Sequence, residues 1–419
     1  MEKKPKKLHY AWVISIATTL LIFMSLGIIS NCFSSYLPFL IKEFNLTNAQ
    51  NSSLMTARWV TTVVSMLFVN LYYEKVKYRA GMALACLFTA AGHLIYSFAT
   101  GYIPCVIGSL IMGIGYGLGS MIPATILVSR WFIKNRQLAI GISTAGSSLA
   151  TMILPTTITK CIERFGLALT FRLEALAIVL IAVIIFLLVR ERPEDMGLKP
   201  YGYEENATAG PAKIKGNAER QSVTPLLWGL LLIAGFFMGA EANPIYSHVT
   251  INYTAAGYPE MKAALFFSIT GLVLFVAKII CGKIGDNQGG IRTAYLFGAI
   301  QIAGFVFASM APLHSGVVNA LAIFCIGFGT PLPTMSISLW STDLVNQKEY
   351  PKSVARMQIA YSLGSLCFSS VPGIIADHFG GQYSMAFIAT CFITLAGLAT
   401  ITIAYIKVGV FKEAIKRKG

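Results

Sequence analysis

The chain has 419 residues, of which 55% are hydrophobic and 12% are charged. A soluble domain carries about 25% charged residues, so this composition excludes a soluble globular protein and indicates an integral membrane protein. The formal net charge of +15 does not indicate a nucleic-acid partner, because the basic residues lie in short segments between long apolar stretches.

Twelve apolar stretches follow one another along the chain, and few charges interrupt them. Each is long enough to cross the ~30 Å hydrocarbon core of a bilayer as a helix. The first is too long for a signal peptide, and no small-residue cleavage site follows it, so we expect it to be retained. We therefore predict an all-α membrane protein with twelve transmembrane helices, at residues 10–34, 50–71, 80–99, 101–128, 137–159, 168–190, 223–249, 262–281, 292–311, 314–340, 353–376 and 382–406.

The stretch 191–221, between the sixth and seventh spans, contains Arg, Glu, Lys, Pro and Gly and has no apolar period. Such a composition is typical of a solvated linker. We expect it to separate an N-terminal six-helix bundle, residues 1–190, from a C-terminal six-helix bundle, residues 222–419. The two halves also repeat. An offset of 212 residues aligns Glu74 with Asp286, and parallel six-helix repeats are typical of one large class of transporters.

Lys and Arg are distributed unevenly between the two sides of the predicted membrane. Of the 33 basic residues, 26 fall in the terminal segments and the alternate connections on the side of the N-terminus, and five fall on the other side. Cytoplasmic segments carry the excess of Lys and Arg in membrane proteins. We therefore expect a multi-pass protein of the cell (inner) membrane with both termini in the cytoplasm.

The remaining polar residues do not form a recognisable catalytic or cofactor site. The eight cysteines include no CxxC pair and lie mostly inside apolar stretches, where thiols fill helix interfaces. No metal-ligand spacing, nucleophile–base pattern or nucleotide-binding loop occurs. We therefore predict that the protein is not an enzyme, binds no metal or cofactor, and is driven by ion or substrate gradients.

Two loops resemble the signature loop of the major facilitator superfamily. The second copy contains Gly282, Asp286 and Arg292, and the first, degenerate copy contains Glu74 and Arg79. The resemblance implies two six-helix bundles that work by alternating access. It also implies a cytoplasmic charge relay at these loops, which steadies one conformation of the carrier.

A narrower resemblance covers essentially the whole chain and points to the monocarboxylate-porter and oxalate:formate-antiporter branches. It rests on a glycine ladder in the fourth span, on the start of the linker, and on the ends of the eighth and eleventh spans. The residues are Gly113-x-Gly115-x-Gly117-x-Gly119, Arg190 to Pro193, Ala277-Lys278 to Asp286, and Pro372-Gly373 to Asp377. This resemblance implies a carrier of small organic anions.

Lys278 lies inside the span 262–281, where a charge costs several kcal/mol unless it faces a cavity or a partner. It occupies the position at which the branch has an arginine that neutralises the substrate carboxylate. A lysine keeps the charge but lacks the bidentate fork of arginine. The alternative is that its four-carbon stem extends to the headgroups, since Gly282 is only one turn away.

Two departures from the branch favour a monoanion over a dianion. Leu363 stands where oxalate:formate antiporters have a lysine, and Asn31 stands where monocarboxylate porters have a lysine in the first span. Arg58 could supply a second charge to an anion, or could anchor its span at the membrane interface next to Trp59. Tyr361 is a further candidate for lining the substrate cavity.

Glu241 is an acid inside the seventh span, near Pro244. An acid there must be paired, protonated or solvated. We predict that Glu241 pairs with Lys278 or carries a coupling proton, and a water-facing position near the outer mouth is the alternative. His93 and His248 are weaker candidates, because lone histidines commonly hydrogen-bond within helix bundles.

These features predict a secondary active transporter that moves a small organic anion, with a monocarboxylate favoured, by proton symport or anion exchange. Its partners would be the anion, protons in the case of symport, and the lipid bilayer, and we expect a monomer. One alternative is efflux of drugs or other small molecules on the same fold, for which Glu241 is the supporting residue. The other is a non-transporting membrane sensor, which only the degenerate first loop supports.

Overall fold

A computed structural model describes residues 9–46, 48–203, 223–369 and 371–408 of the chain. Part of the predicted linker, residues 204–222, lies outside this described part. The basic residues at positions 3–7, 213–220 and 412–418, which contribute to the charge asymmetry, also lie outside it. The elements that the structure describes are helices joined by short connections.

In the described residues, the first half of the chain contains six spans. They are α1 (Ala11–Ile22) continued by the π-helical η1 (Phe23–Cys32), α3 (Asn48–Leu67) with α4 (Val69–Lys75), α5 (Tyr78–Ser97), α6 (Tyr102–Leu118) with α7 (Met121–Trp131), and α8 (Arg136–Leu188), which contains two. The short helices η2 (Phe33–Ser35) and α2 (Leu37–Phe44) follow the first span, and η3 (Pro193–Met196) lies at the start of the linker.

The described part of the second half contains another six spans. They are α10 (Pro225–Ser247) followed by α11 (Val249–Ala255), α12 (Glu260–Gln288), α13 (Gly290–Ser309) followed by η4 (Ala311–Leu313), α14 (Gly316–Gly329) with α15 (Pro331–Leu344), α16 (Tyr350–Phe368) with α17 (Val371–His378), and α18 (Ser384–Lys407). Capping residues in the sequence mark where some of these helices begin. Thr224 caps α10 by accepting the Leu227 N–H, and Pro225 occupies its first turn.

The 53-residue helix α8 is too long for one span, because it would extend about 80 Å at 1.5 Å per residue. Gly166 breaks it, with φ 79° and ψ 167°, a conformation that glycine adopts far more readily than other residues. In the described residues, ten helices have the length and composition to cross a membrane, and the α3–α4 pair, bent by 56°, makes an eleventh. Dividing α8 at Gly166 gives the predicted twelve.

The predicted signature loops are helical rather than irregular. Helix α12 continues past its predicted end at Cys281 to Gln288, so Gly282 and Asp286 lie on its last turns. Glu74 lies on the short helix α4. The loop predictions were wrong because polar residues and glycines interrupt the apolar period in these turns, whereas packing between helices keeps the backbone helical despite weak local propensity.

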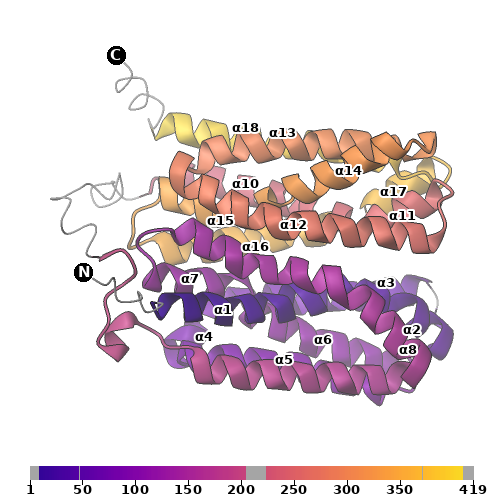
Figure 1. Ribbon diagram of the computed structural model, residues 1–419, viewed down its shortest axis with the longest axis horizontal. Coiled ribbons are helices and arrows are strands. Elements are labelled where there is room, and N and C mark those ends of the chain that lie inside the picture. The colour runs from indigo at the N-terminus through magenta and orange to yellow at the C-terminus, as the bar shows by residue number, and fades with distance from the viewer. Residues whose placement is uncertain (1–8, 47, 204–222, 370, 409–419) are drawn as a thin grey trace, which may run out of the picture.

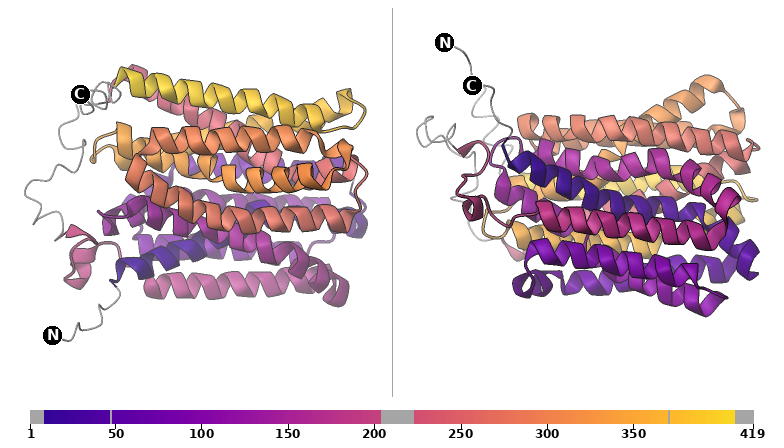
Figure 2. Two further views of the ribbon diagram at one scale, coloured as in Figure 1. Left: turned by 45° about the horizontal axis from the view of Figure 1, so that its top comes forward. Right: turned by 60° about the horizontal axis from the view of Figure 1, so that its bottom comes forward.

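The helices run along the long axis of the molecule, and the two halves of the chain form two layers (Figure 1). In the turned views, parts of the two halves overlap in projection (Figure 2). Helix α1 begins and α18 ends at the same end of the molecule, which we call the α1 end. The short helices α2, α11 and α17 lie at the opposite end, the far end (Figure 1).

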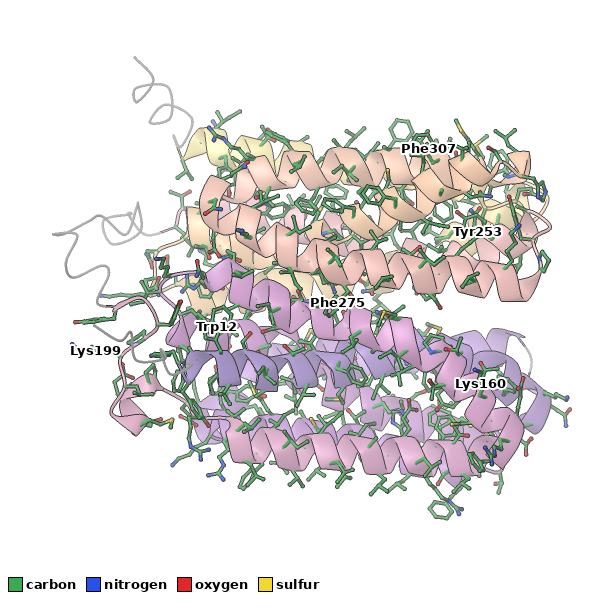
Figure 3. All side chains as sticks on the ribbon, viewed as in Figure 1. Trp12, Lys160, Lys199, Tyr253, Phe275 and Phe307 are labelled. Carbon is green, nitrogen blue, oxygen red and sulfur yellow. The ribbon has the colours of Figure 1, made fainter. Side chains whose placement is uncertain are left out.

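The interior is mostly apolar, and the outer surface between the two ends is apolar as well, as a bilayer requires. Trp131, Trp340 and Phe171 are fully buried. On the second span of α8, Leu173, Leu180 and other large apolar side chains are exposed, where lipid can cover them. Charged side chains gather at the two ends of the molecule. Figure 3 shows Lys199 at the α1 end and Lys160 at the far end.

Candidate functional site

Lys278 is buried between the two halves of the chain. Its side chain leaves α12 and lies against α8, and only 1% of the residue is exposed. The ammonium donates to the backbone carbonyl of Thr144 at 2.9 Å and to Ser147 Oγ at 2.8 Å. An ammonium has three N–H donors, so one remains without an acceptor in the described part of the chain. The side chain therefore does not extend to the headgroups.

Two glycines allow α8 and α12 to touch on either side of Lys278. A Cβ at Gly141 would lie 2.5 Å from the Lys278 carbonyl oxygen, and a Cβ at Gly282 would lie 2.4 Å from the Gln137 carbonyl oxygen. Both distances are shorter than van der Waals contact. Because the backbones approach this closely, the Lys278 ammonium reaches the carbonyl of the facing helix directly.

Asn31 and Asn243 are related by the same 212-residue offset that aligns the two signature segments. Asn31 donates to Thr151 Oγ1 at 2.9 Å. Asn243 donates to Ser365 Oγ at 3.1 Å and to the Tyr361 hydroxyl at 3.4 Å. In each half, an asparagine of the first span therefore bonds to a hydroxyl of the fifth span. Sequence analysis included Asn31 and missed Asn243 as its counterpart.

Tyr361 lies where the two halves meet. It is 6% exposed, and Tyr116 of the first half and Glu241 of the second are within electrostatic range of its hydroxyl. The next residue on α16, Ser362, donates to Met66 Sδ of α3 at 3.2 Å. Helix α16 therefore packs against the first half beside Tyr361.

Glu241 is buried in the second half, away from Lys278. The residue is fully buried, and its Oε2 accepts a hydrogen bond from the Thr394 hydroxyl of α18. Its Oε1 has no hydrogen-bond partner among the described residues. The predicted pairing of Glu241 with Lys278 is therefore not what the structure contains, and neither is a water-facing position. A coupling role for this acid stays a prediction.

Arg58 is packed inside the first half. The residue is 4% exposed, its guanidinium donates to the Ile29 carbonyl at 2.5 Å, and its Cζ lies 4.8 Å from the centre of the Phe33 ring. These contacts hold the side chain against the first span and away from both water and the headgroups. Arg58 thus contacts Ile29 and Phe33, whereas Lys278 contacts α8.

Asp286 connects the two halves at the α1 end. Its two carboxylate oxygens accept the backbone N–H groups of Gln137 and Leu138, at 2.9 and 2.8 Å, in the first turn of α8. The first N–H groups of a helix have no partner within it and carry partial positive charge, so a carboxylate there is favourable. The Gln137 side chain adds bonds to Thr342 and Ser338 of α15.

The first signature segment does not make the equivalent contact. Glu74 is exposed, and it has no hydrogen bond or ion pair among the described residues. Arg79 donates to the Phe186 carbonyl and lies over the Phe186 ring, 4.1 Å from its centre, within the first half. Arg292 is exposed. The helix-capping contact between halves is therefore made by Asp286 and not by Glu74.

Sequence analysis missed a buried contact between a histidine and a glutamate. His93 Nε2 lies 3.3 Å from Glu174 Oε2, and within the described residues no other basic side chain lies this close to a carboxylate. The Tyr36 hydroxyl donates to the same carboxylate oxygen at 2.6 Å. Glu174 was overlooked because no sequence pattern connects it with His93. The acid inside an otherwise apolar span was the signal that could have drawn attention to it.

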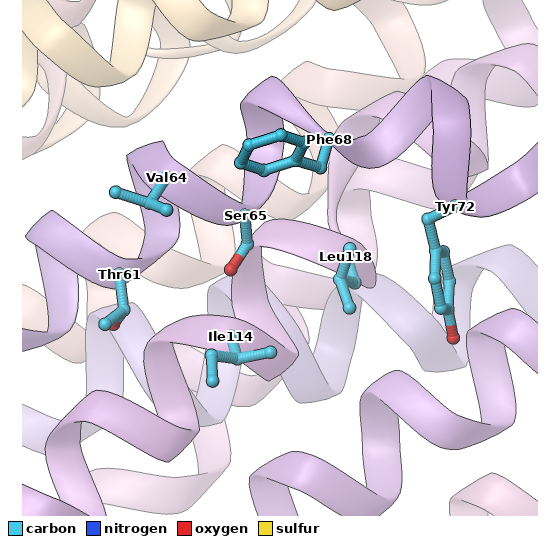
Figure 4. Close-up of a pocket in the computed structure, with 7 residues that line it drawn as sticks. All are labelled: Thr61, Val64, Ser65, Phe68, Tyr72, Ile114 and Leu118. Carbon is cyan, nitrogen blue, oxygen red and sulfur yellow. The ribbon is translucent and has the colours of Figure 1, made fainter.

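The surface grooves lie elsewhere. The groove in Figure 4, of about 350 Å³, lies between α3 and α6 and is lined by Thr61, Val64, Ser65, Phe68, Tyr72, Ile114 and Leu118. Val64 and Phe68 are exposed on the outer face, so this groove opens toward lipid. A second, of about 450 Å³, lies at the far end beside Lys262 and His314. Neither includes Lys278.

Comparison with known proteins identifies related sequences. Residues 19–348 match the sequence model described as Major Facilitator Superfamily. An MFS-type transporter of Gibberella moniliformis is 22% identical over 353 residues, which cover 81% of this chain and 80% of that protein. Monocarboxylate transporter 12 of Mus musculus is 21% identical over 428 residues, covering 95% and 86%. Monocarboxylate transporter 4 of Gallus gallus is 26% identical over 307 residues, covering 69% and 60%.

Solved structures share the fold. The proton:xylose symporter XylE, bound to 6-bromo-6-deoxy-D-glucose, matches this structure with a TM-score of 0.72. The match covers 95% of this chain and 96% of that chain at 16% sequence identity. At this identity the likeness concerns the arrangement of the helices and carries no information about the substrate.

Proposed function

We propose that this chain carries a small organic anion, with Lys278 as the main contact of that anion. The chain belongs to the major facilitator superfamily and is a multi-pass membrane transporter rather than an enzyme. The favoured class of substrate is a monocarboxylate. Transport would proceed by alternating access, with residues 1–190 and 222–419 acting as two bundles. The protein would lie in the cell (inner) membrane, with the α1 end facing the cytoplasm.

The buried charge of Lys278 carries this proposal. No carboxylate of the described residues lies within ion-pair distance of its ammonium, although taking a charge out of water costs several kcal/mol. Hydrogen bonds to Thr144 and Ser147 offset part of that cost. A substrate carboxylate between the halves would supply the missing counter-charge. The monocarboxylate transporters among the relatives support the same class of substrate.

Proton symport and anion exchange are both compatible with this site. In a symporter, Glu241 would carry the proton, because it is a buried acid with one oxygen that has no partner among the described residues. Its other oxygen accepts a hydrogen bond from the Thr394 hydroxyl, and Glu241 has no ion pair with a described residue. Substrate and proton would then occupy different places in the second half.

Efflux of other small molecules is the second candidate, and Glu241 is the observation that favours it. A cationic compound needs a buried carboxylate without a neighbouring lysine, and Glu241 forms no ion pair with a described residue. The two candidates predict different ligands. An anion carrier binds carboxylates through Lys278, whereas a cation exporter binds amines through Glu241.

The test begins with ligand binding to the purified protein. Small monocarboxylates, dicarboxylates and organic amines are screened for an increase in thermal stability, since a ligand that binds the folded state raises its apparent stability. A compound that stabilises the protein is then used in uptake assays with proteoliposomes. We expect a monocarboxylate to be identified. Stabilisation by amines alone would contradict the proposal.

The variant Lys278→Gln tests whether Lys278 is the residue that contacts the substrate anion. Removing one partner of a buried charge pair costs about 3–5 kcal/mol, so we expect at least a 100-fold loss of affinity. Lys278→Arg keeps the charge and should retain part of the uptake. The matched control is Lys262→Gln, because Lys262 is an exposed lysine on the same helix. Full uptake by folded Lys278→Gln would exclude Lys278 as the anion contact.

A further inference from the structure

The second surface groove, of about 450 Å³, changes from polar to apolar along its length. It lies between α12 and α14 in the second half, and neither Lys278 nor Glu241 lines it. Tyr258, Lys262 and His314 form its mouth at the far end. Beyond the mouth its walls are apolar side chains of the two helices, namely Ile269, Val273, Ala320, Ile323 and Phe324. The groove therefore has a polar head and an apolar tail.

Two aromatic rings hold the ammonium of Lys262 at the mouth of the groove. Its Nζ lies 5.3 Å from the centre of the Tyr258 ring and 5.9 Å from the centre of the Phe266 ring. Both distances are within the range of cation–π contacts. No carboxylate of the described residues lies within ion-pair distance of this ammonium. Lys262 therefore presents a positive charge that has no counter-charge in the described part of the chain.

Tyr258 is fixed in place by two residues on the α14 side of the groove. The Asn319 amide donates to the Tyr258 hydroxyl at 2.5 Å, and the His314 ring stacks on the Tyr258 ring, with ring centres 4.6 Å apart. Asn319 and Tyr258 are both buried, so their bond is protected from water. The Tyr258 hydroxyl accepts this bond, which leaves its own hydrogen for another acceptor. The mouth is thus a rigid arrangement of donors that joins both walls.

The apolar part of the groove faces the hydrocarbon of the bilayer. Ile269 on α12 is 40% exposed and Phe324 on α14 is 52% exposed. Val273 follows Lys262 by eleven residues, which is about 17 Å along a helix. The groove therefore extends from the end of the spans well into the ~30 Å hydrocarbon core. Since lipid is the medium that meets this surface, an acyl chain fits the apolar part.

A phospholipid with a net negative charge matches this order of polar and apolar walls. Its phosphate lies at the level of the headgroups, where Lys262 and the Tyr258 hydroxyl are available as donors. Basic residues at the membrane surface attract anionic lipids, and charge-assisted hydrogen bonds to phosphate are stronger than those between neutral groups. A zwitterionic headgroup brings an ammonium of its own, which Lys262 repels. The groove should therefore prefer an anionic headgroup.

We propose that the groove between α12 and α14 binds an anionic phospholipid, with the phosphate at Lys262 and one acyl chain between the two helices. The bound lipid would connect the far ends of two helices of the second half. This site does not depend on the identity of the substrate, because Lys278 lies about 24 Å further along α12. The Lys278 variants are compared in phosphatidylcholine vesicles, where no anionic lipid fills the groove, so Lys262→Gln remains their control.

The experiment measures the binding of single lipid molecules to the purified protein in a neutral detergent by native mass spectrometry. The probes are dioleoylphosphatidylglycerol, which is anionic, dioleoylphosphatidylcholine, which has no net charge, and glycerol 3-phosphate, which has a phosphate but no acyl chains. We expect the anionic lipid to bind at least about fivefold more tightly than the neutral one, the factor that one lysine contributes near a membrane surface. Glycerol 3-phosphate should not bind at concentrations at which the anionic lipid saturates the site.

Two variants separate the headgroup from the acyl chain. Lys262→Gln removes the positive charge and should reduce the preference for the anionic lipid to less than about twofold. The matched control is Lys160→Gln, which should keep the preference of the parent, because Lys160 is an exposed lysine at the far end of the first half (Figure 3). Ala320→Phe leaves Lys262 in place and fills the apolar part of the groove, since Ala320 is exposed on its wall. Both lipids should then bind at least about fivefold more weakly, because the acyl chain loses its place.

An unchanged preference in folded Lys262→Gln would overturn the proposal, and so would unchanged lipid binding by Ala320→Phe. Binding of glycerol 3-phosphate as tight as that of the anionic lipid would mean that the groove holds a free phosphate, which also contradicts the proposal. Equal binding of the two lipids by the parent is a further contrary result. That measurement needs no substitution, so a variant that fails to fold does not remove the test.

Discussion

Lys278 keeps a charge inside a transmembrane span because two oxygen atoms of α8 take the place of water. A buried cation needs such partners. The Thr144 carbonyl and the Ser147 hydroxyl occupy two of its three N–H groups. Both acceptors belong to the opposite half of the chain. A substrate that competes for the ammonium would therefore act on the contact between the halves.

A single central cation should prefer monoanions. Arg58 is the other buried cation considered for the substrate, and its guanidinium contacts Ile29 and Phe33 of the first span. Bringing a second, unpaired carboxylate out of water costs several kcal/mol, and each 1.4 kcal/mol is about tenfold in affinity. We expect lactate-like monoanions to inhibit uptake at least 100-fold better than succinate-like dianions.

The comparison is made in proteoliposomes, with the parent and Arg58→Gln side by side. The order of inhibition should be the same in both proteins, provided that the variant folds. A preference for dianions in the parent that disappears in Arg58→Gln would mean that Arg58 turns into the cavity when substrate binds.

Glu241 gives a second prediction at the level of single residues. An amide cannot bind a proton, so Glu241→Gln should lose proton coupling while it can still bond to Thr394. We expect uptake by the parent to depend on pH across the physiological range and uptake by Glu241→Gln to be independent of it. The same profile in both proteins would leave Glu241 with a structural role.

At the scale of elements, the spans could be predicted and several of their contacts could not. A helix across a bilayer needs about 20 apolar residues, and that requirement is visible in the sequence. The end of α12 was missed, because packing rather than local pattern keeps Gly282 to Gln288 helical. The pair of His93 and Glu174 was missed because it joins α5 to α8, and no periodicity within one helix reports a partner on another.

Glycines determine how closely these helices pack, and α10 offers a comparison within one helix. A Cβ at Gly239 would overlap the Tyr361 carbonyl oxygen on α16, whereas a Cβ at Gly229 would meet nothing within 4 Å. Overpacking typically costs about 1–3 kcal/mol. An unhindered Gly→Ala change in a helix gains up to about 1 kcal/mol.

We therefore expect Gly239→Ala to lower the stability of the purified protein and Gly229→Ala to maintain or raise it. Equilibrium unfolding in mixed micelles measures both. If the two changes have equal effects, the close approach of α10 and α16 is not a property of the folded protein.

At the scale of the whole molecule, several of the contacts that join the halves lie at the α1 end. Asp286 of α12 caps α8, Gln137 bonds to α15, and the Arg136 guanidinium lies over the Tyr350 ring, 4.6 Å from its centre. The pseudo-equivalent Glu74 makes no such contact in the described part. The repeat in sequence is therefore not matched by equal contacts, and this conformation has its halves joined through the Asp286 contact.

Asp286→Asn should weaken that connection. The asparagine can still accept one backbone N–H of α8, but its amide group cannot accept the other, and the charge at the helix N-terminus is lost. A hydrogen bond to a charged group contributes about 1.5–3 kcal/mol, so the balance between closed and open states at the α1 end should shift by about tenfold or more.

Cys281 reports this shift, because it is fully buried one turn after Lys278 on α12. We expect a small maleimide to alkylate Cys281 about ten times faster in Asp286→Asn than in the parent, with mass spectrometry separating it from the other cysteines. Glu74→Gln is the matched control, because Glu74 occupies the equivalent position in the other half and has no partner among the described residues. In this variant, the rate of Cys281 alkylation should stay within about twofold of the parent. Equal rates of Cys281 alkylation in Asp286→Asn and in the parent would contradict this prediction. The other contacts at the α1 end would then be sufficient to keep the halves together, and the Asp286 carboxylate would not determine which end of the carrier is open.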